Sequence, residues 1–465
     1  MHCRYGRAAV SAEFDDDTLI GYAGLVPLLG LAQRAGLAGL CHDMLTVPSG
    51  RGNNHAGANT AGKVATLIAG MAAGADSIED MDLLRHGGMG AVFDGVSAPS
   101  TLGTFLRGAS WGTPAQFAAL ARAFTTGLAR HAPMLANRAG MLFIDIDDKV
   151  TEVYGPAKHG AAFGYRGIRG LNSMIAVAAT DRRRPVIIGQ RLRRGSATSG
   201  TGARSFVADA LAAATGTGHT GPIMVRLDSG FYSAAVVAAV RAAGAHVSVG
   251  VRQFRWVREL IAGIEETAWQ PYDYAGATPS SRDDRGAHTV LTDAAAADIP
   301  YEAFGSHPRD LRVPGRLIIT RRPVRHPDTD EQHTLFPTYR YHAFFTTQPA
   351  SDIDTVTAVY QHHRHAIVEQ IHADLHAGPL AHWPSGDFVA NHIWLHLAAM
   401  TYNLLRAAAS LTHTLTTATS ATLRRTLIAV PARLAHRARR LIVHLPRHWH
   451  HQHDWHTLTG TPARH

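Results

Sequence analysis

Three acidic residues have the type and spacing needed to hold metal ions for phosphodiester chemistry: Asp147, Asp228 and Glu369. Asp147 ends a predicted strand that begins at Met141, Asp228 follows a later predicted strand, and Glu369 lies within a predicted helix. Two hard cations held by carboxylate oxygens can activate an attacking oxygen and stabilise a leaving one. Mg²⁺ prefers few protein carboxylates plus water and substrate phosphate, so this chemistry requires neither Cys nor His.

Each acid alone also has an ordinary structural explanation. Asp145 and Asp147 share one face of the predicted strand, so only one need be a ligand, and Asp148 points the opposite way. Asp228 precedes Ser229-Gly230 and could cap a turn, while Glu369 fits a solvated helix position. A shared catalytic role for the three acids is therefore supported only by the order of the strands and helices that carry them.

That order is typical of a ribonuclease-H-like sheet with an insertion. We expect strands at 141–147, 152–154, 174–178, 185–189, 222–227 and 246–251, and helices at 205–214, 234–243, 354–375 and 388–409. The predicted fold is therefore α/β, with an RNase H-like catalytic core, a β-rich insertion and a helical N-terminal DNA-binding region. The predicted divisions are 1–135 (helical), 136–254 (first part of the core), 255–347 (insertion), 348–410 (last helices of the core) and 411–465 (basic His/Arg-rich tail).

The composition narrows the class of partner and the cellular setting. The 465 residues carry a formal charge of +9 with a pI near 9.8, which makes a polyanion the first partner to test. Cys3 and Cys41 are the only cysteines, which excludes a disulfide framework. We expect a cytoplasmic protein, because neither a signal peptide nor a long apolar segment is visible. The sequence also has no phosphate-binding G-x-x-x-x-G-K-[ST] loop and no G-x-S-x-G elbow.

Local motifs add a resemblance to a known family. Residues 143–148 with Lys158-His159-Gly160-Ala161, residues 226–232 (Arg-Leu-Asp-Ser-Gly-Phe-Tyr) and residues 360–370 around Glu369 occur in this order. These segments resemble the three catalytic motifs of DDE-class transposases of bacterial insertion sequences. Within that class the chain looks like the branch with a β-strand insertion before the Glu. The resemblance covers about 141–406 well and the N-terminal region loosely.

The resemblance implies a set of site residues. Asp147, Asp228 and Glu369 would bind two Mg²⁺ ions, with Mn²⁺ as a substitute. Asp147 is preferred over Asp145, because the class commonly has its ligand immediately before a short polar pair. Tyr360 and Arg364 would contact DNA phosphate, although they lie further from Glu369 than the class spacing Y-x2-R-x3-E-x6-K requires. His376 replaces the expected Lys, and a protonated His could still donate to a phosphate near neutral pH.

Further DNA contacts are expected outside these motifs. The end of one predicted strand carries Arg191, Arg193 and Arg194. These side chains could contact the DNA backbone, or they could simply be a solvated edge of the sheet. Trp256 and Trp269 begin the insertion, where related enzymes can stack a flipped base, although a place in the core of the insertion is the commoner role for such residues.

The implied function is that of an insertion-sequence transposase. It would bind the terminal inverted repeats of its element in double-stranded DNA, cleave phosphodiesters at the element ends, and join the 3′-hydroxyls to target DNA. Because two ends must be brought together, we expect a homodimer or a higher assembly. No membrane partner is expected.

Two alternatives remain open at this point. His365, Glu369, His372 and His376 form one helical stripe that could hold zinc, as in a His-rich metal-dependent hydrolase. A non-catalytic DNA-binding protein, either a repressor or a decayed element, would retain the sheet without its activity. The His/Trp-rich end is predicted to be a disordered basic tail.

Overall fold

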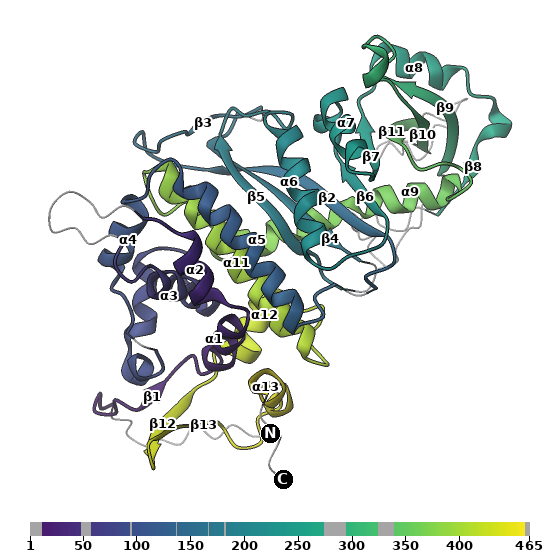
Figure 1. Cartoon of the computed structure of the whole chain (residues 1–465). Helices are drawn as coiled ribbons and strands as arrows, with labels where there is room; N and C mark the ends of the chain where they lie inside the picture. The colour runs from purple at the N-terminus through teal and green to yellow at the C-terminus, as the bar shows by residue number, and fades with distance from the viewer. Residues whose placement is uncertain are drawn as a thin grey trace, which may run out of the picture.

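A single mixed sheet runs through most of the molecule. The structure is a computed structural model that describes residues 12–47, 57–93, 95–135, 137–165, 167–180, 183–273, 294–323 and 339–460. In this sheet the strands follow the order β3-β4-β2-β6-β7-β11-β10-β9-β8, and β5 also pairs with β4. Figure 1 shows the helical N-terminal region beside one end of the sheet and the insertion at the other.

The core of the sheet has the predicted α/β arrangement. β2 pairs antiparallel with β4 and parallel with β6, and β6 pairs parallel with β7. The elements of this part are β2 (Leu142–Glu152), β3 (Ala162–Phe163), β4 (Arg169–Ala179), β5 (Val186–Arg194), α6 (Ala203–Gly216), β6 (Ile223–Leu227), the 3-10 turn η3 (Ser229–Phe231), α7 (Ala234–Ala242) and β7 (His246–Val251). The buried faces of β4 and β5 explain the continuous apolar runs in the sequence.

One strand boundary differs from the prediction. The sequence predicts that a strand ends at Asp147 and that a second strand covers 152–154, but β2 runs without a break from Leu142 to Glu152. The extra residues keep pairing with β4 after β6 has ended, as far as Glu152 opposite Gly170. Asp147 is therefore in mid-strand, at the point where β2 loses its parallel neighbour.

The insertion extends the core sheet. β11 pairs with β7, and β10, β9 and β8 follow in antiparallel order. Its elements are α8 (Arg255–Ala262), η4 (Glu266–Ala268), β8 (Gln270–Pro271), β9 (Ala295–Ala303), η5 (Arg309–Leu311), β10 (Val313–Pro323) and β11 (Tyr339–Thr346). The helix α8, which carries Trp256, was not expected in a segment predicted to be rich in β-structure.

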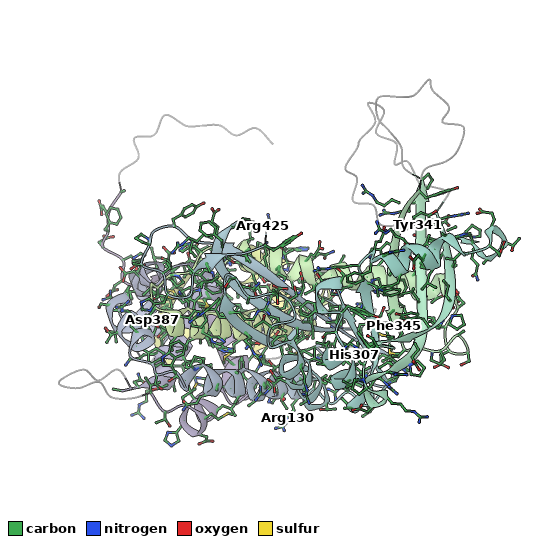
Figure 2. The ribbon with its side chains drawn as sticks, turned by 90° about the horizontal axis from the view of Figure 1, so that it is seen from above. Arg130, His307, Tyr341, Phe345, Asp387 and Arg425 are labelled. Atoms are coloured by element: carbon green, nitrogen blue, oxygen red, sulfur yellow. The ribbon has the colours of Figure 1, made fainter. Side chains whose placement is uncertain are left out.

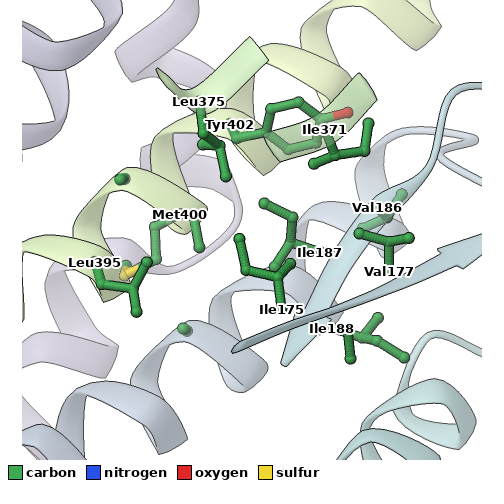
Figure 3. Packing of buried hydrophobic residues seen from close by; sticks show 14 of the residues in the cluster. Ile175, Val177, Val186, Ile187, Ile188, Ile371, Leu375, Leu395, Met400 and Tyr402 are labelled. Atoms are coloured by element: carbon green, nitrogen blue, oxygen red, sulfur yellow. The ribbon is translucent and has the colours of Figure 1, made fainter. Parts of the chain in front are cut away.

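The first of the two long helices predicted after the insertion is broken. It divides into α9 (Thr355–His363), the 3-10 turn η6 (Arg364–Ala366) and α10 (Ile367–His376). The second, α11 (Phe388–Leu411), is buried over almost its whole length. Figure 3 shows Ile175 and Ile187 of the sheet facing Met400 and Leu395 of α11, which places this helix against β4 and β5.

The N-terminal helices surround α11. A helix that is apolar on all sides must be covered on all sides, and α3, α4 and α5 cover the surface of α11 that the sheet leaves open. The elements here are α1 (Leu25–Arg34), α2 (Leu37–Met44), α3 (Thr60–Ala73), η1 (Glu79–Arg85), η2 (Gly87–Ala91), α4 (Pro99–Arg107) and α5 (Thr113–His131). Gly108 directly follows the end of α4 at Arg107.

The His/Trp-rich end was predicted to be disordered, but its described residues 448–460 are folded and include a helix. The residues before it pair with the start of the chain. β12 (Ala432–Arg437) pairs with β1 (Leu19–Ile20) and with β13 (Arg440–His444). The remaining elements are α12 (Ser420–Leu423), the π-turn η7 (Arg424–Ile428) and α13 (Gln452–Thr459). Trp449 and Trp455 pack on the core, so the aromatic residues of this segment are structural. Among the described residues, no helix is long and apolar enough to cross a bilayer.

Candidate active site

The ends of two parallel strands bring Asp147 and Asp228 together. The last paired residues of β2 and β6 are Ile146 and Leu227, and the two acids are the next residue of each strand. Asp228 accepts a hydrogen bond of 2.9 Å from the backbone N–H of Gly230 in the turn that follows. Because neighbouring parallel strands keep their side chains in register, the two acids lie side by side at one edge of the sheet.

Both acids resist ionisation. Burial, helped by the nearby charge of Asp228 and opposed by His365, raises the pKa of Asp147 to about 6. Burial also raises the pKa of Asp228, and the charge of Asp148 adds to this effect. Two partly desolvated carboxylates beside other negative charges are unfavourable in their charged forms, and a bound cation would relieve both effects.

Asp145 has a different role from Asp147. Its side chain is fully buried, and Nε and Nη2 of Arg226 donate to its two oxygens at 2.7 Å each. Nδ1 of His365 lies 3.0 Å from Asp145 Oδ1, and Nη1 of Arg226 donates to the carbonyl oxygen of Gln361 at 2.6 Å. Asp145 therefore ties β2 to β6 and to the end of α9, whereas the side chain of Asp147 stays 25% exposed.

Asp148 has its own set of hydrogen-bond partners, different from those of Asp145 and Asp147. Its carboxylate accepts hydrogen bonds from Arg193 Nη2 at 2.8 Å, from Ser199 Oγ at 2.7 Å and from Asn172. Consecutive residues of a strand point to opposite faces, so Asp148 anchors the loop after β5 while Asp147 faces α10. Of the three acids in this stretch, Asp147 is the one that no arginine neutralises in the described structure.

Glu369 is not drawn into this pair. It lies in the first turn of α10 and is exposed, one residue after the buried Val368. His372, one turn further along α10, has Nε2 at 4.0 Å from Asp147 Oδ2, so Glu369 is on the side of the helix nearest the two acids. Among the described residues, no group of three His, Cys, Asp or Glu side chains is arranged to hold a metal ion.

Two histidines of α10 are buried. Burial lowers the pKa of His376 to about 4 and that of His372 to about 3. His376 is therefore neutral near pH 7 in this conformation, and its contact with a DNA phosphate stays a prediction. The zinc stripe is not formed, because no metal-holding group exists in the described part of the chain and His365 is engaged by Asp145.

The basic strand end divides into three different environments. Arg193 is buried and donates to Asp148, Asn172 and the carbonyl oxygen of Thr201, so in this structure it positions Asp148, and its contact with DNA stays a prediction. Arg191 is partly exposed and pairs with Asp209 at 3.2 Å. Arg194 is exposed at the end of β5. Strand alternation explains the difference between Arg193 and Arg194.

Two other predicted DNA contacts lie at the insertion side of α9. Tyr360 is half-buried, and its hydroxyl accepts a hydrogen bond of 3.1 Å from the backbone N–H of Asp273. Arg364 is exposed in the turn between α9 and α10. Trp269 lies under the guanidinium of Arg321 at 4.4 Å, which is an internal contact of the insertion.

A pocket of about 630 Å³ opens between the second motif and the insertion. Its walls include Tyr232, four residues after Asp228, and Trp256 of α8, which stacks on Tyr301 at 5.2 Å. The remaining lining residues are Glu259, Leu260, Phe304, Gly305, Ser306 and His307. The aromatic walls are compatible with the base-stacking role expected for Trp256, although its stacking partner in the structure is Tyr301.

Sequence reasoning missed the buried contacts beneath the two acids. Arg226 and His365, which hold Asp145, were each part of a quoted motif but received no role of this kind. The register of β2 and β6 would have indicated the first contact, because Asp145 stands directly opposite Arg226. No comparable signal exists for His365, since its position depends on the break between α9 and α10.

Comparison with known families agrees with this architecture. A family model described as "Transposase DDE domain group 1" matches residues 4–461, which is nearly the whole chain. No curated protein matches the sequence. The match includes both parallel strands with their terminal acids, the insertion and the helix that carries Glu369. The chain belongs to the DDE transposase domain family.

Proposed function

We propose that this transposase binds the terminal inverted repeats of its insertion element, cleaves phosphodiester bonds there by two-metal chemistry, and joins the freed 3′-hydroxyls to target DNA. The observation that carries the proposal is the pair Asp147 and Asp228, which are adjacent at the ends of the paired stretch of β2 and β6 and both have raised pKa values. Carboxylates in this state are costly unless a cation is bound between them.

The donor set of the pair fits Mg²⁺. Hard oxygen ligands and a partly exposed edge that admits water and phosphate are what this ion requires. In the proposal Asp147 and Asp228 hold the metal, and bound Mg²⁺ supplies the positive charge that activates the attacking oxygen and stabilises the leaving one. Asp145 and Arg226 act beneath them by fixing β2 against β6.

Glu369 is proposed as the third ligand. Its exposed side chain in the first turn of α10 has rotamer freedom, and its helix already contacts β2 through His372 and Asp147. A cation at the pair would attract the Glu369 carboxylate into the site. The proposal therefore expects a rearrangement of this side chain when metal and DNA are bound.

DNA and a second copy of the chain complete the assembly that we propose. The net charge of +9 favours binding to a polyanion, and Arg194 and Arg364 are exposed cationic side chains near the acidic edge or the helix of Glu369. Joining two element ends requires that at least two active sites be held together, so a homodimer or a higher assembly is expected.

The test is a cleavage assay on duplex DNA that carries the element's own terminal repeats, with Mg²⁺ present or removed. We expect metal-dependent nicking at the repeat boundary, and its loss in Glu369→Gln. Gln370→Glu, a change at the neighbouring exposed position, is the matched control and should cleave normally. Binding without cleavage in either Mg²⁺ or Mn²⁺ would instead favour a non-catalytic DNA-binding protein.

A further inference from the structure

A segment that we call the arm follows the end of β2 and reaches the edge strand β3 of the sheet. It comprises residues 153–168, of which 153–165 and 167–168 are described, and includes the short edge strand β3. Arg169 fixes its first turn, because Nη1 donates to the carbonyl oxygen of Gly155 at 2.8 Å. The backbone N–H of His159 donates to Gly386 at 2.9 Å, and Lys158 Nζ donates to the carbonyl oxygen of Trp383. The arm is therefore held against the loop before α11.

The arm exposes large aromatic side chains that it does not need for its own packing. Tyr154 and Phe163 are 80% and 68% exposed, and Tyr165 is fully exposed. A braced segment that displays three aromatic rings on one short stretch is unlike the isolated exposed apolar residues of an ordinary surface. These rings indicate a contact surface for another molecule.

The charge of the arm identifies the kind of molecule. Between positions 153 and 169 the sequence carries Lys158, Arg166 and Arg169 and no acidic residue, while the exposed Glu152 just before this stretch accepts a hydrogen bond of 3.0 Å from the Tyr154 hydroxyl. The exposed Arg194 is next to this segment, because the backbone N–H of Gly195 donates to the carbonyl oxygen of Gly160 at 3.1 Å. A symmetric contact between two copies would bring these like charges together, whereas a polyanion complements them. Aromatic and basic side chains together are typical of nucleic-acid surfaces.

The position of the arm relates it to the candidate active site. Asp147 and the arm lie on the same strand, β2, and five residues separate Asp147 from the strand's end at Glu152. At about 3.3 Å per residue this is about 17 Å. The same length of duplex contains about five base pairs. Asp387, which lies 3.9 Å from His159 at the base of the arm, and Tyr341 of the insertion are at opposite ends of the molecule in Figure 2.

We propose that the described residues of the arm, 153–165 and 167–168, bind duplex DNA that runs along β2, about five base pairs from the phosphate that is cleaved. The rings of Tyr154, Phe163 and Tyr165 contact sugars and base edges, while Arg194 contacts the backbone. This inference rests on the proposed function, because it takes the cleaved phosphate to lie at Asp147 and Asp228. In this proposal the DNA passes the two acids with the arm on one side of them and the insertion on the other.

The test compares Phe163→Ser/Tyr165→Ser with wild type in a DNA-binding measurement. Fluorescence anisotropy with a labelled terminal-repeat duplex, without divalent metal, gives the Kd of each protein. We expect about a tenfold weaker Kd for the double variant, as for the loss of aromatic contacts to nucleic acid. Thermal unfolding should be unchanged, because both side chains are solvent-exposed. Leu441→Ser removes an exposed apolar side chain from β13 and should bind like wild type.

Three outcomes would overturn the inference. The first is an unchanged Kd for DNA in the double variant, and the second is an equal weakening of DNA binding in Leu441→Ser. The third is a double variant that binds DNA normally but has half the wild-type mass in light scattering. The last result would assign the arm to contact between two copies. Failure of the proposed function is recognised separately, because wild type would then fail to cleave its terminal-repeat DNA whatever the arm variant does.

Discussion

The guanidinium of Arg226 donates two hydrogen bonds of 2.7 Å to the buried carboxylate of Asp145, two residues before Asp147. This ion pair distinguishes two acids that the sequence presents as equivalent on one strand face. Asp145 has its charge neutralised inside the protein, and Asp147 does not. The first metal ligand is therefore proposed to be Asp147, and the two acids should differ in their effects on folding.

Arg226→Met tests the structural role of the pair. It leaves Asp145 as a buried charge without its arginine, and we expect a loss of about 3–5 kcal/mol in unfolding free energy. Asp147→Asn should leave stability unchanged or increase it, because it removes a carboxylate that burial disfavours. Urea unfolding followed by circular dichroism measures both. Equal destabilisation by the two variants would contradict the division of roles.

The raised pKa of Asp147 makes a prediction about pH. Its folded value of about 6 exceeds its ordinary value of 3.8, so the folded state binds more protons between these values. Without divalent metal, stability should therefore fall by up to about 2–3 kcal/mol as the pH rises through this window. Thermal unfolding in chelator should show a shallower pH dependence for Asp147→Asn. An identical dependence in the two proteins would assign the effect to other groups.

Metal binding should reverse this loss. At neutral pH, Mg²⁺ at ten times its Kd should stabilise the folded protein by ~1.4 kcal/mol, because it binds the charged pair in the folded state only. Asp147→Asn and Asp228→Asn should abolish the increase in Tm, whereas Asp209→Asn, an exposed acid on α6, should retain it. A Mg²⁺ effect that survives both site variants would place the metal elsewhere.

Arg193 and Arg194 provide a comparison of neighbouring residues. Arg193→Met should destabilise the protein by about 3–5 kcal/mol, because it leaves the partly buried Asp148 without its arginine. Arg194→Met should keep the stability of wild type and weaken DNA binding at low salt, with a decrease of about one in the slope of log Kd against log salt. The reverse pattern would contradict the observed strand alternation.

The sequence was sufficient for most of the element order in the core of the sheet. β7 was predicted at its observed bounds, and the adjacency of Asp147 and Asp228 follows from the parallel pairing of the strands that carry or precede them. These features depend on local apolar periodicity and on strand order, which a single sequence carries.

Features that depend on tertiary contacts were not predictable. The continuation of β2 to Glu152 is stabilised by pairing with β4, and the break at η6 gives His365 its place beside Asp145. The neutral state of His376 results from burial, which the spacing to Glu369 does not reveal. The fold of the tail depends on pairing between β12 and β1, residues that are more than 400 positions apart.

We propose that the Asp228 carboxylate takes part in metal binding and DNA cleavage and is not needed to hold the fold. Its side chain accepts one short-range hydrogen bond from Gly230, which Asn can also accept. The most direct test measures cleavage and binding of the same terminal-repeat duplex by Asp228→Asn. The account predicts that cleavage in Mg²⁺ is abolished while the Kd for DNA stays within a few-fold of wild type. Equal loss of cleavage and binding would contradict it and make Asp228 a structural residue.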